Sequence, residues 1–117
     1  MKELFILNEE LKGFSSVIIY GTGNAGRGIF LKLLQRNVKV DCFIDSYPEN
    51  CGSAIFGVPV HHIREISGKT DSAIIVGGRY TFPVAAELKK FGYDHIFYDL
   101  SSEAEIIHLE RDGYYAD

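Results

Sequence analysis

The sequence predicts an α/β fold in three layers, with a mostly parallel sheet of about five strands between helices. Short apolar runs alternate with stretches of helical periodicity, as βαβ units require. The first of these runs, residues 17–20, leads through a glycine-rich turn into an amphipathic helix over about 24–36. Another such run, residues 73–76, is also followed directly by glycine. Since the first and fourth strands of a doubly wound sheet are neighbours where the winding reverses, we expect the strand order 3-2-1-4-5.

Length and composition indicate one ordinary globular domain. The chain has 117 residues, of which 46% are hydrophobic and 24% charged, and its formal net charge is −4. An acidic balance argues against nucleic acid or anionic lipid as a partner, and no apolar run reaches the length of a membrane span. The first ten residues lack the features of a signal peptide. The two cysteines form no C-x-x-C pair, so we expect a cytoplasmic protein with incidental thiols.

Within this single domain, 1–117, we expect a short helix at 3–12, a core at 15–100 and a helical tail at 101–117. The N-terminal helix follows from apolar side chains at helical spacing, and it either covers a sheet edge or forms a dimer contact. The tail follows from a capping-box pattern at Ser102 and Glu105.

The hexapeptide GTGNAG after the first strand is a G-x-G-x-x-G motif in the strand–turn–helix context that gives it meaning. Gly21 allows a tight turn, Gly23 lets a diphosphate approach the backbone, and Gly26 lets the helix pack against the strand. The N–H groups of Asn24, Ala25 and their neighbours in the first helical turn are then free to bind an anion. The alternative is a tight turn without a ligand.

Arg27 stands in the first turn of the predicted helix, where the helix dipole favours anions rather than cations. A phosphate would be a suitable partner, although a solvated surface arginine fits equally well. The side chains expected to face the core are Ile29, Phe30, Leu33 and Leu34.

The second strand is predicted at 38–44, with alternate apolar residues, among them Cys42, on one face. Asp45 ends this strand 19 residues after Gly26, the spacing at which dinucleotide folds place a ribose-binding acid. Asp45 and the adjacent Ser46 therefore belong to the candidate site. A carboxylate here repels a 2′-phosphate, which favours NAD over NADP. The alternative is a loop aspartate that caps the next turn.

Residues 46–57 are predicted as a loop that contains Cys51, which we expect to be exposed. A short strand at 58–60 follows. Pro59 cannot donate to a ladder, so this strand is expected at the sheet edge. His61 and His62 are adjacent and point opposite ways on an extended chain, so they make a poor pair of metal ligands.

The fourth strand ends in Gly77 and Gly78, beside the glycine end of the first strand in the expected order. Bare backbone on both sides would form a crevice for a nucleotide, with Arg79 at its rim. A helix is expected from Thr81 to a stop at Gly92. Its inward side chains would be Val84, Leu88 and Phe91, and a fifth strand follows at 95–98.

Five segments carry a resemblance to known domains: GTGNAGRG, FIDSYPEN, IFGVPVHH, IIVGG and FGYDHIFYDL. Over roughly residues 15–100 the chain resembles the small Rossmann domain of membrane-bound nucleotide-sugar dehydratases of bacterial capsule synthesis. It is also similar to the nucleotide-sugar-binding domain of sugar acetyltransferases. The resemblance implies a Rossmann-like fold in which Gly21, Gly23 and Gly26 hold a diphosphate and Asp45 a nucleoside. The loop is nearer to the NAD-binding form than to the Ser-Gly-His loop of the acetyltransferases.

The motifs complete no catalytic site: no tyrosine precedes a lysine by four residues, and no nucleophile elbow or H-E-x-x-H is present. The leading hypothesis is an NAD-type nucleotide-binding module of cell-surface polysaccharide or nucleotide-sugar metabolism, as a homodimer or as part of a larger enzyme. The alternative is a UDP-sugar-binding domain whose catalytic part lies on another domain or chain. A third hypothesis is an oligomerisation domain without a ligand.

Overall fold

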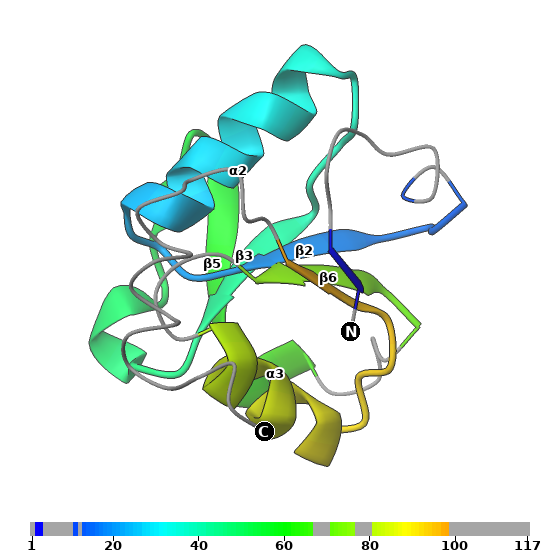
Figure 1. Ribbon diagram of the computed structural model, residues 1–117. Coiled ribbons are helices and arrows are strands. Elements are labelled where there is room, and N and C mark those ends of the chain that lie inside the picture. The colour runs from blue at the N-terminus through cyan, green and yellow to red at the C-terminus, as the bar shows by residue number, and fades with distance from the viewer. Residues whose placement is uncertain (1, 4–10, 12, 67–70, 77–80, 99–117) are drawn as a thin grey trace, which may run out of the picture.

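The computed structural model describes residues 2–3, 11, 13–66, 71–76 and 81–98, which form a mixed α/β structure around one mostly parallel sheet (Figure 1). The strand order is β1-β7-β6-β2-β3-β5-β4. The strands are β1 (Lys2–Glu3), β2 (Val17–Tyr20), β3 (Cys42–Asp45), β4 (Ala54–Ile55), β5 (Val58–His62), β6 (Ala73–Val76) and β7 (Ile96–Tyr98). The helices are α2 (Asn24–Gln35) and α3 (Thr81–Lys90), with 3₁₀ turns η1 (Pro48–Asn50) and η2 (Ile63–Ile66).

The strand order differs from the predicted 3-2-1-4-5 because two short strands extend the sheet at its edges. The strands expected from the sequence are β2, β3, β5, β6 and β7, and they occupy the interior of the sheet. β1 adds to β7 in parallel, and β4 pairs with β5 antiparallel. Each of these two strands has two residues, too few for a period-2 pattern to be visible in the sequence.

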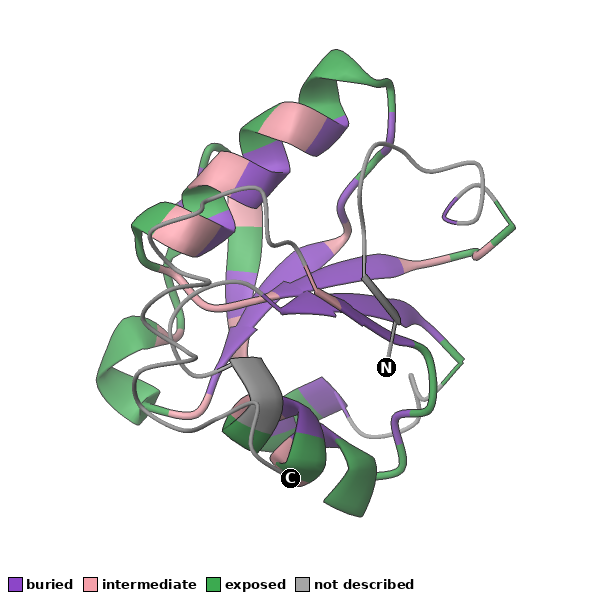
Figure 2. Cartoon of the chain, viewed as in Figure 1, coloured by how far each residue is buried: buried purple, intermediate pink, exposed green. Residues whose placement is uncertain are grey.

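The helices α2 and α3 lie on opposite faces of the sheet (Figure 1). Alternate residues of β2 point to the two faces, as a pleated strand requires: Ile19 packs with Ile29 and Leu33 of α2, whereas Ile18 packs with Leu88 of α3. Both sides of the central strands are therefore buried, as Figure 2 shows in purple. This burial explains why β2 and β6 read as continuous apolar runs rather than as alternating ones.

Both helices end in the same hydrogen-bonded motif. In α2, Asn37 adopts φ 60°, its N–H donates to Leu34 O at 3.1 Å, and Val38 N–H donates to Leu33 O at 2.9 Å. In α3, Gly92 takes the left-handed position with φ 94°. This is the Schellman arrangement, which satisfies carbonyls at the end of a helix.

Two predictions of inward-facing side chains need correction. Leu34 is 58% exposed and Phe91 is 39% exposed, whereas Ala85 is buried. Each exposed residue lies in or just beyond the last turn of its helix, where the chain leaves the sheet. Val38 and Val40 pack on the α2 face rather than with Cys42, because the regular strand begins only at Cys42.

The prediction that the Pro59 strand forms the sheet edge was wrong, because β4 lies outside it. Val60 uses both its N–H and its carbonyl toward the β4 side, to Ser53 O and Gly52 N. The missing N–H of Pro59 therefore faces β3, one residue before the first β3–β5 pair, Phe43 and Val60. No ladder bond is lost there.

Some sequence-based expectations fall outside the described residues. These are the helical tail at 101–117, most of the N-terminal helix at 3–12, and the segment 77–80. Glu3, expected in that N-terminal helix, belongs to strand β1 instead. Among the described residues, neither helix has the length and apolar character needed to cross a bilayer.

Candidate functional site

The glycine turn lies between the carboxyl end of β2 and the start of α2. Gly21 has φ 108°, and its N–H donates to Ile44 O at 2.9 Å, so the turn is tied to β3. A Cβ on Gly26 would overlap the carbonyl oxygen of Gly21, whereas a Cβ on Gly23 would meet nothing within 4 Å. Gly26 is thus required by close packing inside the protein. Gly23 faces open space.

The N-terminus of α2 has no side-chain cap. Its N-cap is Gly23, which has no side chain to accept an N–H; in the part of the chain that the structure describes there is no side-chain cap, and the first turn holds no acid. The first helical bond is Arg27 N–H to Gly23 O at 3.0 Å. The N–H groups of Asn24, Ala25 and Gly26 precede it and have no acceptor within the helix. They are the donors that a bound anion would use.

Arg27 adds positive charge to the same end of the helix. Its Nε donates to the carbonyl of Thr22 at 3.0 Å, so the side chain folds back over the glycine turn. The guanidinium thereby stands beside the uncapped N–H groups, although it is exposed to solvent.

Asp45 is 7% exposed and lies at the end of β3 with both carboxylate oxygens engaged. Oδ1 accepts the N–H of Tyr47 at 2.8 Å, which forms an Asx-turn. Oδ2 accepts the Thr22 hydroxyl at 3.0 Å and the Asn50 amide at 3.3 Å. Asp45 therefore caps the turn that follows it and also links that turn to the glycine turn.

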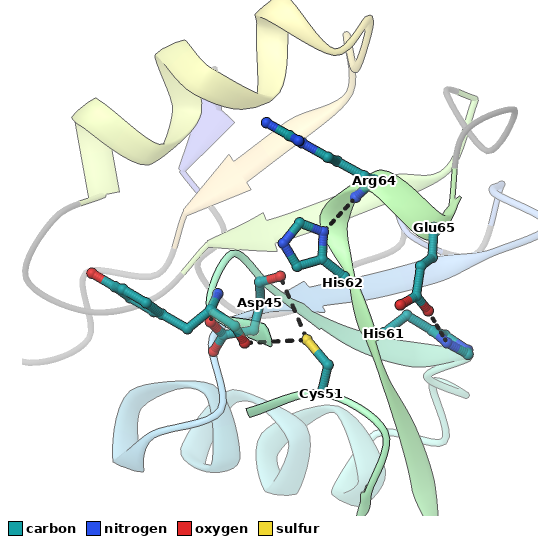
Figure 3. Close-up of polar contacts among 7 residues, drawn as sticks. Asp45, Cys51, His61, His62, Arg64 and Glu65 are labelled. Atoms are coloured by element: carbon teal, nitrogen blue, oxygen red, sulfur yellow. Dashed lines mark hydrogen bonds and ion pairs between the residues drawn. The ribbon is translucent and has the colours of Figure 1, made fainter. Parts of the chain in front are cut away.

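A chain of hydrogen bonds crosses the strand ends on the other face of the sheet. The Tyr20 hydroxyl donates to Ser46 Oγ at 3.0 Å, and Ser46 O lies 3.1 Å from His62 Nε2. Arg64 N–H donates to His62 Nδ1 at 3.1 Å (Figure 3). Because Nδ1 accepts, Nε2 must carry the proton and donate to Ser46. The two contacts together select the Nε2-protonated tautomer of His62.

Cys51 is half-buried and its thiol points back toward β3 (Figure 3). Its Sγ lies 3.4 Å from the Tyr47 carbonyl and 3.8 Å from the Asp45 carbonyl. Desolvation, followed by the charges of Asp45, Glu65 and Glu49, raises the pKa of this thiol above its ordinary value. The proton therefore stays on sulfur, and Cys51 acts as a weak donor to the turn rather than as a nucleophile.

His61 points away from His62 and pairs with Glu65 across 3.6 Å (Figure 3). Within the described ranges, no three His, Cys, Asp or Glu side chains converge as metal ligands would.

The glycine turn stands where the chain reverses its winding. From β2 the chain passes through α2 to β3 on one side, and later returns to β6 on the other side of β2. Tyr20 pairs with Val76, the last residue of β6. Gly77, Gly78 and Arg79, predicted to complete the crevice, lie outside the described residues.

Tyr20, the last residue of β2, lies at this switch point. Burial raises the pKa of its phenol most, and the hydrogen bond to Ser46 lowers it. The charges of Glu87 on α3 and of Asp45, and then the Tyr47 phenol once it ionises, raise it further. Groups from α3 and from the turn after β3 thus both come within electrostatic range of one phenol.

No protein-family model matches this sequence, and neither does any of the curated proteins. Its own geometry carries the argument for function.

The structure brings together most of the residues that the sequence singled out. Gly21, Gly23, Gly26, Asp45 and Ser46 meet at the carboxyl ends of β2 and β3. Sequence reasoning did not identify Tyr20, Thr22, Tyr47, Asn50 and His62 as partners of Asp45 and Ser46. The signal for Tyr47 was present, because an aspartate two residues ahead is typical of an Asx-turn. Thr22 and His62 are far away in sequence and left no local signal.

A separate hollow of about 320 Å³ lies at the opposite, amino-terminal end of the strands. It is lined by Leu11, Phe14, Ser15, Val17, Asn37, Val38, Lys39 and Asp41. None of these belongs to the glycine turn.

Proposed function

We propose that this protein is a Rossmann-like nucleotide-binding module that holds the diphosphate of an NAD-type dinucleotide against its glycine turn. The observation that carries the proposal is the uncapped N-terminus of α2 behind Gly23, at the switch point between β2 and β6. Ligands of open α/β sheets bind in this crevice, outside the carboxyl ends of the strands. The metabolic setting, cell-surface polysaccharide or nucleotide-sugar synthesis, rests on the motif resemblance alone.

Three features of the turn favour an anionic ligand. The N–H groups of Asn24, Ala25 and Gly26 have no acceptor within the helix, and the helix dipole directs positive potential outward. Arg27 adds a full charge beside them. At Gly23, the absence of a Cβ leaves the backbone open to the approach of a phosphate.

Asp45 is proposed to bind the ribose through Oδ2. Oδ1 is committed to a backbone N–H, but the two donors to Oδ2 are the side chains of Thr22 and Asn50, which can rotate away. A ribose hydroxyl would replace them as the donor. A 2′-phosphate would meet the carboxylate charge, so NADP is disfavoured.

A UDP-sugar is the second candidate ligand, since it presents the same diphosphate and ribose to the same groups. In that case the chain supplies the binding domain of a sugar-modifying enzyme of the dehydratase or acetyltransferase type, whose catalytic part lies elsewhere.

The test is a pair of glycine substitutions. Gly23→Ala and Gly28→Ala both introduce a methyl group into open space, and Gly23 has an ordinary φ of −84°. Both variants should fold, but only Gly23→Ala places the methyl group where a phosphate would lie. Melting temperatures are measured with NAD, NADP, UDP and UDP-N-acetylglucosamine.

A ligand at 100 times its Kd adds about 2.7 kcal/mol, or roughly 4–8 °C for a domain of this size. We expect this shift for the wild type and for Gly28→Ala, and its loss in Gly23→Ala. Absence of a shift with every nucleotide would refute the proposal. An equal shift with NADP would refute the role of Asp45.

A further inference from the structure

Tyr47 combines a fixed backbone with an exposed ring. Its N–H donates to Asp45 Oδ1 at 2.8 Å, and its carbonyl accepts the N–H of Asn50 at 3.0 Å and faces the Cys51 thiol at 3.4 Å. Its side chain is nevertheless 62% exposed, the most exposed of the large hydrophobic residues described. The fold thus anchors the main chain of this residue without using its ring.

The position of Tyr47 places that ring at the candidate nucleotide site. It comes two residues after Asp45, at the carboxyl edge of the sheet. Its phenol also comes within electrostatic range of Tyr20, which immediately precedes the glycine turn. The backbone hydrogen bond to Asp45 therefore holds Tyr47 beside that carboxylate, and its exposed ring lies at this edge of the sheet.

We infer that Tyr47 is the base-stacking residue of a nucleoside subsite in which Asp45 Oδ2 takes the ribose. This inference rests on the proposed function and names the part of the ligand beyond the diphosphate: an aromatic base joined to a ribose. An exposed ring with a preset backbone is suited to stacking, because little conformational entropy is lost when a base covers it. Stacking does not discriminate between bases, so the subsite would accept the adenine of NAD or the uracil of UDP.

The experiment measures the Kd of NAD, UDP and inorganic pyrophosphate for four proteins: the wild type, Tyr47→Ala, Tyr47→Phe and Leu34→Ala. Isothermal titration calorimetry supplies the values, and melting temperatures without ligand check the folding. Leu34→Ala is the matched control, because Leu34 is 58% exposed and lies near the far end of α2 from the glycine turn.

We expect Tyr47→Ala to raise the Kd of the tighter-binding nucleotide about 10- to 100-fold, while the Kd of pyrophosphate stays unchanged. Tyr47→Phe and Leu34→Ala should stay within about twofold of the wild type. The melting temperature of Tyr47→Ala should change little, because the ring is exposed.

The possible failures are distinguishable. If the wild type binds neither nucleotide, the proposed function fails and the subsite fails with it. If the wild type binds but Tyr47→Ala binds equally well, only the stacking inference is wrong. A parallel loss of pyrophosphate binding, or failure of Tyr47→Phe to restore affinity, would mean that Tyr47 acts through the turn, and would also overturn the inference.

Discussion

Gly26 is the residue at which the glycine turn has least room. A Cβ there would overlap the carbonyl of Gly21, so no side chain fits, whereas Gly28, two residues further along the helix, faces open space. The two glycines sit in the same helix and differ in this contact, so they form a natural comparison.

Gly26→Ala is expected to lower the free energy of unfolding by about 1–3 kcal/mol, because the methyl group forces the helix away from β2. Gly28→Ala should be neutral or raise it by up to about 1 kcal/mol, since alanine stabilises a helix interior relative to glycine. Urea denaturation measures both. Equal values for the two variants would contradict the close-packing role of Gly26.

At the residue scale, the sequence predicted the tight turn at Gly21, the close packing at Gly26 and, as one alternative, the turn capped by Asp45, but not the contacts of Asp45 with Thr22 and Asn50. The glycine roles follow from a local motif whose geometry is standard. The partners of Asp45 depend on how the turn after β3 meets the turn after β2, and Thr22 is 23 positions away. The local sequence pattern around Asp45 does not indicate this contact between the two turns. The structure supports the capping of a turn by Asp45, and its ribose contact stays a prediction.

Among the elements, the β4–β5 hairpin carries the least usual backbone. Its two connecting residues, Phe56 and Gly57, have φ 54° and 79°, as in a type I′ turn. Glycine suits this conformation, but phenylalanine does not. The ring of Phe56 compensates by stacking on Phe30 of α2, with centroids 5.2 Å apart and planes 14° apart.

Substitution of Phe56 separates these two effects. Phe56→Ala and Phe56→Asn both lose the stacking, worth about 0.5–1.5 kcal/mol, but asparagine tolerates the left-handed conformation and alanine does not. We expect the free energy of unfolding, measured in urea, to be about 1 kcal/mol higher for Phe56→Asn than for Phe56→Ala. If the asparagine variant is no more stable, backbone strain at this turn is negligible.

The sequence predicted the elements with a clear pattern but not the two-residue strands. The helix expected at 24–36 and the strand at 73–76 match α2 and β6 closely, because each has a full period or a continuous apolar run. β4 has only two residues, and its pairing depends on the turn at Phe56. Phenylalanine is not a typical residue for such a turn, so the sequence predicts a loop over 46–57, where β4 and this turn lie.

For the whole molecule, the half-buried phenol of Tyr20 and the buried phenol of Tyr93 connect segments that are distant in sequence. Tyr20 links β2 to the turn after β3, and Tyr93 is 2% exposed and donates to Ile66 O at 3.2 Å, joining the end of α3 to η2. Burial is the main reason that the pKa of both phenols lies above the ordinary value of 10.0.

These phenols predict a loss of stability in alkali. Above pH 10 the unfolded chain releases their protons while the folded chain retains them, so unfolding becomes more favourable as pH rises. Their contribution is complete below pH 10 and is lost as pH rises through the folded-state pKa values. The free energy of unfolding, measured in urea from pH 8 to 11.5, should fall above pH 10.

Tyr93→Phe provides the control for this prediction. It should be less stable than the wild type at pH 8 by about 1–3 kcal/mol, because Ile66 O loses its donor. Its decline above pH 10 should be shallower, since one titrating group is gone. An identical slope for both proteins would contradict the role of Tyr93.

The pairing of β1 with β7 has a consequence for the order of assembly during synthesis on the ribosome. Lys2 lies opposite Phe97, so β1 waits for a partner that is made almost a hundred residues later. At translation rates of roughly 5–20 residues per second, that delay is about 5–20 s. The central strands β2, β3 and β5 all emerge earlier, and the edge strand closes last.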